Sequence, residues 1–505
     1  MVDAGRHDHG IACADQMFFG VVENESGAAF FDPEETYVGY IAQDGKRMFP
    51  YWTEGDFRED KLQVGRSWHY DPFERYLFVN TGDESVPEDH EYHVSVYQTG
   101  ASLSGTKHFV LRGFEIRYFG FAGARVSGGA KDVVISGCNF RNCTMGVYLA
   151  GQTTQDIAIW DNEFTEPGLN DARWGAIKAS EYGRQGVIGF AGRGISICRN
   201  RIDEYFDGIA PSSWLHPDEL GWNRDMDIMY NEIRNTGDDA IEPDGCGVNL
   251  RIHGNVIRNC FAAISLAPVE RGPVYCTRND ATYYMLMFKL NVGGCESLGW
   301  AYSYHNSGYS LCNMSAGAYG GVAISFPGSR SIPISNKVFK NNAIIGNIIA
   351  IRSAYPGTFF DNNCFYHVPG DKPLTFSREV EGEDGRWRNE SFATIEEFRA
   401  ATGHETEGMY ADPLFVSTPG LGQSVWGRYI ESAFGIYPQA ADMSQGDMRL
   451  KAQSPCIDAG QVIRGVNEDY QGDAPDIGAF EFEAVSYTHL RAHETVLDLV
   501  CRLLL

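Results

Sequence analysis

Apolar and polar positions alternate in short runs along the middle of the chain, and an asparagine follows each run. The pattern reads apolar, x, apolar, x, x, Asn, x, apolar, and it recurs between about residues 107 and 363. Alternation with period two predicts β-strands that bury every second side chain. The instances are VISGCNF, IAIWDNEF, ISICRNRI, DIMYNEI, LRIHGNVI and FKNNAII.

The recurring asparagines are spaced by 23, 38, 31, 24, 24, 27, 36 and 21 residues. A base period near 23 with insertions fits one coil of a solenoid whose coils hydrogen-bond to one another. Asparagine tolerates left-handed turns, and its amide can bond to the amides stacked above and below. We therefore predict an all-β, right-handed, single-stranded parallel β-helix. Its turn asparagines are expected at Asn139, Asn162, Asn200, Asn231, Asn255, Asn279, Asn306, Asn342 and Asn363.

A second short strand follows the asparagine in most repeats. Its middle apolar residue is expected to point into the coil and the neighbours of that residue to point out. The segments are MGVYL, WGAIK, FDGIA, DDAIE, AAISL and MFKL.

The repeats divide the chain into five regions. Residues 1–105 are strand-rich and predict an N-terminal β cap, and residues 106–370 hold the coils. Residues 371–410 are polar, and SFATIEEFRAATG within them has helical spacing after a plausible start signal. Residues 411–484 return to strands that close the solenoid, whose open end would otherwise expose unpaired edges. Residues 485–505 fit nothing before them; they resemble translated sequencing-adapter sequence and are expected to lie outside the fold.

Charge and cysteine content narrow the classes of partner. The formal net charge is −26, which argues against nucleic acid and against an anionic membrane surface. No apolar run is long enough to span a bilayer. The twelve cysteines include no CxxC pair, which favours buried unpaired thiols over metal sites or disulfides. No apolar signal-peptide core is visible near the start of the chain.

Two neighbouring repeats, FDGIAPSS and NTGDDAIEPDG, bring acidic residues to one face. Equivalent positions of successive coils stack about 4.8 Å apart, so Asp207 is expected near Asp239, with Asp238 beside them. Clustered carboxylates suit glycoside hydrolysis, in which one protonates the leaving oxygen and another activates water. Close like charges also raise the pKa of one partner. The alternative is that these aspartates cap amides in tight turns.

Further side chains are expected around this face. Glu242 and Asp244 should point outward beside the aspartates, where they suit sugar hydroxyls or a calcium ion. Lys178 and Lys289 are expected at positions equivalent to Glu242; they suit either a base in lyase chemistry or a solvated ion-pair ladder. Two tryptophans in the insertions, Trp214 and Trp222, suit stacking on sugar rings or core packing.

These features resemble the right-handed parallel β-helix superfamily of carbohydrate-active proteins, the pectate-lyase-like solenoids. DPLFV, SPCIDAG and DIGAFE near the end are similar to closing segments of secreted bacterial members. The acidic repeats are similar to those of polygalacturonase-like hydrolases, with Asp207 in YFDG and the pair Asp238 and Asp239 in TGDD. In the next repeats Ala262 stands where that pattern has histidine and Met287 where it has arginine, while Lys289 is kept.

The resemblance implies a polysaccharide or oligosaccharide as the partner and an extracellular or periplasmic monomer. The activity it implies first is glycoside hydrolysis by Asp207, Asp238 and Asp239, with Lys178, Glu242, Asp244, Lys289, Trp214 and Trp222 binding substrate. The alternatives are a polysaccharide lyase with a Lys or Arg base and calcium, and a non-catalytic glycan-binding surface protein. No cofactor is expected, unless calcium serves as one.

Overall fold

The structure is a computed structural model in which parallel strands dominate. It describes residues 11–13, 21–23, 38–71, 73–172, 176–177, 185–189, 192–211, 223–245, 247–290, 296–310, 322–325, 334–346, 357–367, 376–418 and 446–483. Within them the α-helices α1 (Glu54–Arg58) and α4 (Ile395–Thr402) are short. No helix in these ranges has both the length and the apolarity needed to cross a membrane.

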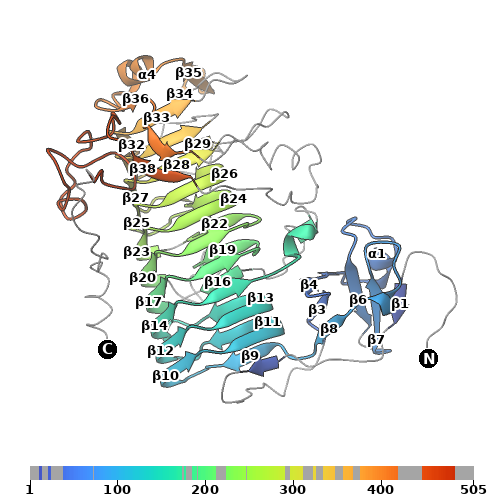
Figure 1. Ribbon diagram of the computed structural model, residues 1–505. Helices are drawn as coiled ribbons and strands as arrows, with labels where there is room; N and C mark the ends of the chain where they lie inside the picture. The colour runs from blue at the N-terminus through green and yellow to red at the C-terminus, as the bar shows by residue number, and fades with distance from the viewer. Residues whose placement is uncertain are drawn as a thin grey trace.

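Ten parallel strands form one continuous face of the molecule, with one strand supplied by each coil (Figure 1). Because each strand pairs with its equivalent in the next coil, the hydrogen bonds run along the axis of the stack. The strands, in order, are β10 (Lys107–Arg112), β12 (Lys131–Ser136), β14 (Gln155–Trp160), β17 (Gly192–Cys198), β20 (Asn223–Met229), β23 (Gly247–His253), β25 (Val274–Thr277), β27 (Ala301–Tyr304), β30 (Lys337–Lys340) and β32 (Phe359–Asp361).

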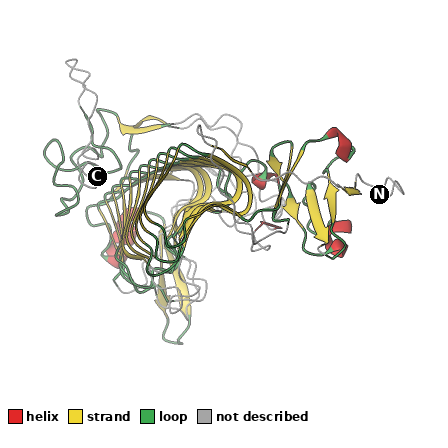
Figure 2. Cartoon of the chain, turned by 90° about the horizontal axis from the view of Figure 1, so that it is seen from below, coloured by secondary structure: helices red, strands yellow, loops and turns green. Residues whose placement is uncertain are grey.

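The remaining strands of the coils form a second continuous system that closes the solenoid. Seen along the axis, successive coils superimpose (Figure 2). The predicted right-handed parallel β-helix is therefore confirmed. These strands are β11 (Glu115–Val126), β13 (Asn139–Leu149), β15 (Glu163–Thr165), β16 (Gln185–Gly189), β18 (Arg201–Asp203), β19 (Asp207–Ala210), β21 (Glu232–Arg234), β22 (Asp239–Ile241), β24 (Val256–Ser265), β26 (Asp280–Lys289), β28 (Ser307–Ser310), β29 (Val322–Ser325), β31 (Ala343–Gly346), β33 (Cys364–His367) and β36 (Met409–Tyr410).

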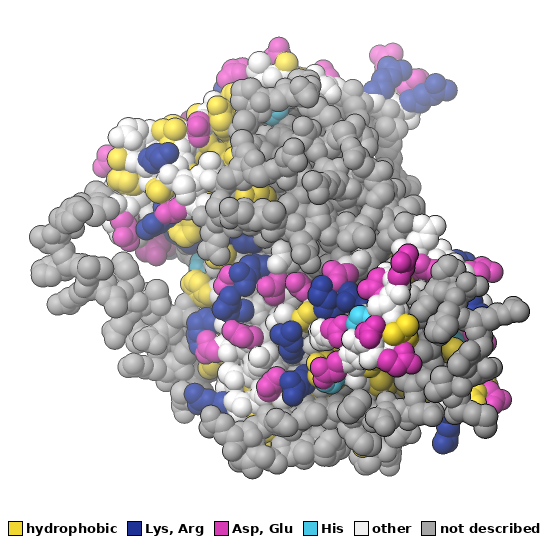
Figure 3. Space-filling model, turned by 45° about the vertical axis from the view of Figure 1, so that its right-hand side comes forward, with side chains coloured by type: hydrophobic (Ala, Val, Ile, Leu, Met, Phe, Trp, Pro, Cys, Tyr) yellow, Lys and Arg dark blue, Asp and Glu magenta, His cyan; other side chains and the backbone are white. Residues whose placement is uncertain are grey.

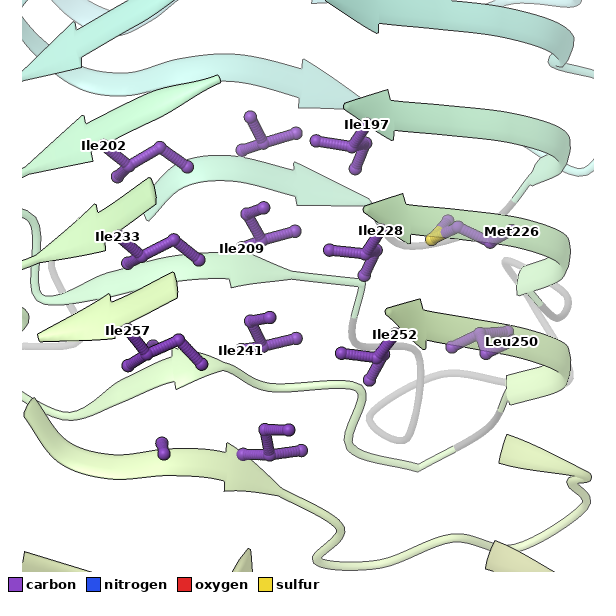
Figure 4. Packing of buried hydrophobic residues seen from close by; sticks show 14 of the residues in the cluster. Ile197, Ile202, Ile209, Met226, Ile228, Ile233, Ile241, Leu250, Ile252 and Ile257 are labelled. Atoms are coloured by element: carbon purple, nitrogen blue, oxygen red, sulfur yellow. The ribbon is translucent and has the colours of Figure 1, made fainter. Parts of the chain in front are cut away.

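Stacked aliphatic side chains fill the inside of the coils (Figure 4). Ile209 pairs in register with Ile241, and Ile241 pairs with Ile264. Both Ile209 and Ile241 are fully buried, as are the isoleucines of the neighbouring columns. Burial of each such side chain stabilises the fold by about 1.5–3 kcal/mol. Figure 4 labels three neighbouring columns. One holds Ile197, Ile228 and Ile252, the second holds Ile202, Ile233 and Ile257, and the third holds Met226 and Leu250.

A row of small residues marks the corner that precedes the inward column of Ile209 and Ile241. A Cβ added to Gly208 would lie 2.5 Å from the carbonyl oxygen of Ala240 in the next coil. A Cβ added to Gly146 would lie 2.5 Å from the carbonyl oxygen of Gly186. Glycine at this corner lets neighbouring backbones approach closely. It also fixes the start of β19, where Asp207 lies.

An asparagine ladder runs through the turns after the first strands. The side-chain oxygen of Asn255 accepts hydrogen bonds from the backbone N–H and the side-chain amide of Asn231, each at 3.0 Å. The Asn255 amide in turn donates to Asn279 at 3.0 Å and to the carbonyl of Ile228 at 2.9 Å. The same exchange links Asn162, Asn200, Asn231, Asn255, Asn279, Asn306, Asn342 and Asn363.

One predicted member of this ladder is wrong. Cys138, rather than Asn139, occupies the turn position, and its N–H donates to the Asn162 side-chain oxygen at 2.9 Å. Asn139 begins the next strand, opposite Glu115 and Glu163. Because the two residues are adjacent in the sequence, the spacing alone placed the turn one residue too late.

At its other end the ladder stops at a buried carboxyl group. The Oε1 of Glu405 accepts from the side-chain amide of Asn363 at 2.7 Å, and its Oε2 accepts from the backbone N–H at 3.2 Å. Burial raises the pKa of Glu405 to about 8, although both hydrogen bonds oppose that shift.

The N-terminal region divides between the first coil and the side of the solenoid. Strands β2 (Val21–Glu23) and β9 (Thr99–Ser102) pair with β11 at the first coil. The others lie beside the coils rather than beneath them (Figures 1 and 2). They are β1 (Ile11–Cys13), β3 (Tyr40–Gln43), β4 (Lys46–Arg47), β5 (Phe49–Pro50), β6 (Ser67–Asp71), β7 (Tyr76–Asn80) and β8 (Tyr92–Ser95).

A buried polar network fastens this side domain to the coils. The Tyr40 hydroxyl donates to Glu166, and Arg47 lies 3.5 Å from the same carboxylate. The amide of Asn142, from β13, donates to the Tyr40 hydroxyl at 3.0 Å. Burial raises the pKa of Glu166 to about 7, and Arg47 opposes that shift. The side domain is thus held where it can form a wall over the coils.

The C-terminal region covers the other end of the solenoid. A hairpin of β34 (Phe376–Glu381) and β35 (Trp387–Phe392) precedes α4, whose predicted start is confirmed by Thr394 capping the N–H of Glu397. Strands β37 (Phe415–Ser417) and β38 (Asp447–Leu450) follow. The DIGAFE segment then returns to the coils, where the N–H of Ala479 donates to Ser307 at 2.9 Å.

The segment WGAIK does not form the coil strand predicted for it. Ala176 and Ile177 are helical, and β16 takes the strand position between β13 and β19. The register places Ile188, rather than Lys178, at the position equivalent to Glu242. An apolar segment inside an insertion resembles a coil strand in sequence, because it is buried against another surface.

We expect Asn255→Ala to lower the free energy of unfolding by ~2–4 kcal/mol, because it leaves two buried donors of Asn231 without their acceptor. Urea unfolding followed by circular dichroism measures the change. Asn139→Ala is the matched control, expected to change stability by less than ~0.5 kcal/mol because Asn139 lies outside the ladder. Equal losses in the two variants would contradict the ladder.

We expect the stability of the protein to fall as the pH rises from about 4.5 to about 8, by up to ~1.4 kcal/mol per pH unit from Glu405 alone. The folded state binds the Glu405 proton more tightly than the unfolded state does. The stability that this proton contributes is therefore complete at low pH and is lost as the pH rises to the pKa of Glu405 in the folded state. Glu405→Gln should remove this part of the slope. Parallel stability–pH curves for the two proteins would contradict the assignment.

Candidate carboxylate site

Two acidic residues of successive coils lie directly above one another. Gln185, Asp207 and Asp239 occupy equivalent positions of β16, β19 and β22. The amide of Gln185 donates to Asp207 Oδ2 at 3.1 Å, and the N–H of Asp239 donates to Asp207 Oδ1 at 3.3 Å. The predicted proximity of Asp207 and Asp239 is confirmed. Asp207, Asp238 and Asp239 are all buried.

A lysine from two coils further along reaches the same place. The ammonium of Lys289 contacts Asp239 Oδ2, and Lys289 stands in register with Ser265, the position that follows Ile264. Glu242 follows Ile241 and therefore lies one coil before Ser265 in the same outward row. Glu242 and Lys289 are partly exposed, so they form the accessible edge of the cluster.

Asp244 completes the group from a buried position. Its Oδ1 accepts from the Ser265 hydroxyl at 2.7 Å and from the N–H of Ala267 at 3.0 Å. One oxygen each from Asp239, Glu242 and Asp244 lie within 4.8 Å of one another. The predicted outward position of Asp244 is wrong, because its side chain is buried against Ser265 and Ala267 of the next coil. The predicted grouping of the acidic residues holds.

The cluster contains five carboxyl groups and one ammonium group, so it carries a negative excess when fully ionised. Burial raises the pKa of Asp239 to about 8 against the opposing charge of Lys289, and Asp238, Asp244 and Asp207 raise it further. Burial and the neighbouring carboxylates also hold the pKa of Glu242 well above its ordinary value. The pKa of Asp244 is raised, chiefly by burial. The cluster therefore retains protons at neutral pH.

Lys289 behaves in the opposite way. Burial alone would lower its pKa, but the surrounding carboxylates, Asp239 foremost, outweigh burial and hold the pKa well above its ordinary value. The ammonium group thus stays charged and neutralises part of the cluster. It is a poor proton acceptor as long as these carboxylates surround it.

The donor set also suits a hard divalent cation. Carboxylate oxygens of Asp239, Glu242 and Asp244 are the ligands that calcium prefers. The Oδ1 atom of Asp239 is buried and has no hydrogen-bond partner in the described part of the chain. Lys289 holds the other oxygen of the same carboxylate, so a cation would share Asp239 with the ammonium group.

The side domain forms a wall next to the cluster. Ala262 and Leu286 continue the row of Asp239 into the following coils, and both are buried in an apolar cluster with Phe49, Leu169 and Ile177. The position where the polygalacturonase-like pattern has histidine is therefore filled with apolar contacts. A pocket at this seam is lined by Phe49, Arg66, Leu169, Asp171 and Ile177, among others, and by none of the five acidic residues.

Other candidates lie elsewhere. Lys178, Trp214 and Trp222 fall outside the described residues. Met287 points into the core of the coils, so no side chain from that position reaches the site. Exposed basic residues pair with neighbouring acids: Arg251 lies 2.5 Å from Asp227. Lys289 is no member of such a solvated ladder, because its partner Asp239 is fully buried.

Sequence reasoning missed two residues of the site, Gln185 and Ser265. Gln185 precedes Asp207 by 22 residues, and Ser265 precedes Lys289 by 24, so both lie one coil from a residue that was identified. The coil period near 23 could have located both. Gln185 was hidden because WGAIK was assigned to its strand position.

The surface around the side domain has mixed charge. Figure 3 shows acidic and basic side chains interspersed over this face, with no continuous basic strip among the described side chains that it displays.

The architecture agrees with that of a known protein family. The family described as "Right handed beta helix region" matches residues 93–268. Pectate lyase Pel9A is 14% identical with a TM-score of 0.32, covering 73% of this chain and 82% of that one. XylC in complex with xylose is 10% identical with a TM-score of 0.35, covering 75% of each. The tailspike protein of E. coli bacteriophage HK620 in complex with pentasaccharide is 9% identical with a TM-score of 0.31, covering 53% and 61%. No curated protein matches, and similarities this distant leave the function to be argued from the site.

We expect Lys289→Met to destabilise the fold by ~3–5 kcal/mol at pH 8 and by clearly less at pH 5. Without the ammonium group, bound protons must neutralise the carboxyl groups, and these are available only at low pH. Thermal unfolding at the two pH values measures the difference. Arg193→Met is the control, because Arg193 pairs with Asp225 at the exposed surface and should cost less than ~1 kcal/mol. A pH-independent loss in Lys289→Met would count against a proton-retaining cluster.

Proposed function

We propose that this right-handed parallel β-helix acts on a polysaccharide, and that its acidic cluster hydrolyses a glycosidic bond. The observation that carries the proposal is the meeting of Asp239, Glu242 and Asp244 at one point, with pKa values raised by burial and by one another. A carboxyl group that keeps its proton at neutral pH is what protonation of a leaving glycosidic oxygen requires.

Exposure assigns the role of acid within the cluster. Glu242 is the partly exposed carboxyl group, and its pKa is raised well above the ordinary value, so we assign it the proton donated to the leaving oxygen. Asp239 lies behind it and shares the proton. The nearest oxygens lie within 4.8 Å, closer than the roughly 6.5–9.5 Å between the carboxyl groups of inverting enzymes. Asp239, Glu242 and Asp244 therefore lie too close together to supply the acid and the base of an inverting pair.

In this proposal the negative charge beside the acid comes from Asp207 and Asp238, on the stacked coils of β19 and β22. Asp207 and Asp238 flank Asp239 from buried positions and supply negative charge that stabilises an oxocarbenium-like transition state. Asp207 also positions Asp239 through the hydrogen bond from the Asp239 N–H. The substrate lies across the edge formed by Glu242 and Lys289, where the ammonium group can donate to sugar hydroxyls. The protein acts as a monomer in the extracellular or periplasmic space.

A polysaccharide lyase is the second candidate, because Lys289 lies within the cluster. In a lyase a basic side chain removes the proton next to a uronate carboxylate while a cation neutralises that carboxylate. Asp239, Glu242 and Asp244 would hold the cation. The raised pKa of Lys289 opposes a role as base in the cation-free protein. Calcium dependence and ultraviolet-absorbing unsaturated products would identify this activity.

A non-catalytic glycan-binding role is the third. It is favoured by the hydrogen bonds that Asp207 and Asp244 accept from the neighbouring coils, since turn aspartates of a scaffold make the same contacts. Glycan binding without product formation, unchanged in Glu242→Gln, would establish this role instead.

We expect Glu242→Gln and Asp239→Asn to lower the rate of polysaccharide hydrolysis by ~10²–10⁴-fold with the fold intact. The purified protein is screened on plant, algal and animal polysaccharides, with and without a calcium chelator, and reducing ends are measured. Asp161→Asn is the control; Asp161 pairs with Arg199 on the outer face of the coils, and its replacement should leave the rate unchanged.

The activity of the unmodified protein should fall as the pH rises past about 8, because Asp239, which shares the proton with Glu242, is then ionised. Products formed at equal rates by the unmodified protein and by both cluster variants would refute the assignment of the site.

A further inference from the structure

We infer that Cys364 and Cys456 form a disulfide that fastens the C-terminal closing segment to the last coils of the solenoid. Cys364 begins β33, directly after the final asparagine of the ladder, and Cys456 lies in the SPCIDAG turn. Both residues are fully buried and belong to one apolar cluster with Ile345, Phe415 and Ile477.

The backbone holds both cysteines in fixed positions. The N–H of Cys364 donates to the carbonyl of Asn342 at 2.8 Å, within the ladder of coils. The N–H of Cys456 donates to the Ser454 hydroxyl at 3.1 Å, and its carbonyl accepts from the N–H of Ile477 at 2.9 Å. Both side chains lie in the one buried cluster at the seam between the coil and the closing segment, where the Cys364 thiol also donates to the carbonyl of Ala411 at 3.2 Å.

The two thiols interact directly in the reduced protein. A hydrogen bond to Cys456, followed by burial, raises the pKa of Cys364 well above its ordinary value. Other described cysteines make contacts within the coils instead: the thiol of Cys143 donates to the carbonyl of Ile116, and Cys276 bonds to Ser303. The pair at the seam therefore stands apart as two thiols that approach each other from different segments.

Formation of the bond is a thiol–disulfide exchange. One thiolate attacks a small-molecule disulfide such as oxidised glutathione and releases one glutathione thiol. The second thiolate then displaces the other glutathione, so that two protons and two electrons leave the pair and two thiols are produced. Because the raised pKa leaves little thiolate in the folded protein, the bond should form before the closing segment docks.

The consequence is a covalent clamp where the solenoid most needs one. About 90 residues separate the two cysteines, and cross-links that close long loops restrict the unfolded chain most. The clamp would hold the closing segment against the end of the asparagine ladder. It suits an oxidising compartment, which is the location proposed above on other grounds.

The test compares the full-length protein produced in the bacterial periplasm with the same chain produced in the cytosol. Free thiols are alkylated under denaturing conditions, and the digested peptides are mapped by mass spectrometry. We expect the peptides of Cys364 and Cys456 to be linked in the periplasmic protein and alkylated in the cytosolic one, with Cys276 alkylated in both. Full alkylation of Cys364 and Cys456 in the periplasmic protein, or linkage of either to another cysteine, would overturn the inference.

Thermal unfolding provides a second readout. A phosphine reductant should lower the melting temperature of the periplasmic protein by several degrees. The double variant Cys364→Ser/Cys456→Ser should melt at the lower temperature whether or not the reductant is present. In the matched control Cys276→Ser, the reductant should still lower the melting temperature. A response that persists in the double variant would assign the effect to other cysteines.

Discussion

The constraint on which the structure depends is the register between successive coils. Each strand pairs with its equivalent one coil further along, so side chains at equal positions stand directly above one another over the whole length of the solenoid. A residue type that stacks well on itself is thereby favoured at every coil. Asparagine does so because its amide offers a donor and an acceptor, and each buried group finds its partner in the next copy.

The same register makes a stack of acidic residues costly. A carboxylate accepts hydrogen bonds but donates none, so Asp207 above Asp239 can be satisfied only by a backbone N–H, an amide or a cation. Gln185 donates a hydrogen bond to Asp207, and Ser265 donates one to Asp244. Lys289 forms an ion pair with Asp239. These partners do not offset all the negative charge. The pKa values of Asp239, Glu242 and Asp244 are therefore raised. A stack of this kind differs in its chemistry from the asparagine ladder, although the same geometry produces both.

The sequence predicted the features that repeat and missed those that depend on contacts between unlike segments. The strand pattern located the coils, and the coil period correctly brought Asp207 next to Asp239. The position of Cys138 in the ladder could not be told from that of Asn139, because a one-residue shift leaves the spacing almost unchanged. WGAIK was mistaken for a coil strand because burial against Phe49 of the side domain produces the same apolar pattern as burial inside a coil. The burial of Asp244 against Ser265 of the next coil depends on tertiary contacts that no local pattern encodes.

The two ends of the solenoid show how the register is brought to a stop. At the start of the ladder, Cys138 donates its backbone N–H to Asn162, so the turn that holds Cys138 needs no side-chain amide. At the other end Asn363 presents two donors with no further asparagine above them, and a carboxylate is a strong acceptor for both. That carboxylate belongs to Glu405, which is buried and gains from holding a proton. The end of the ladder thus sets acceptor strength against the cost of burying a charge, the same opposition that governs the acidic cluster. In the cluster a lysine and a partly exposed glutamate lie at the edge, where water solvates part of the charge.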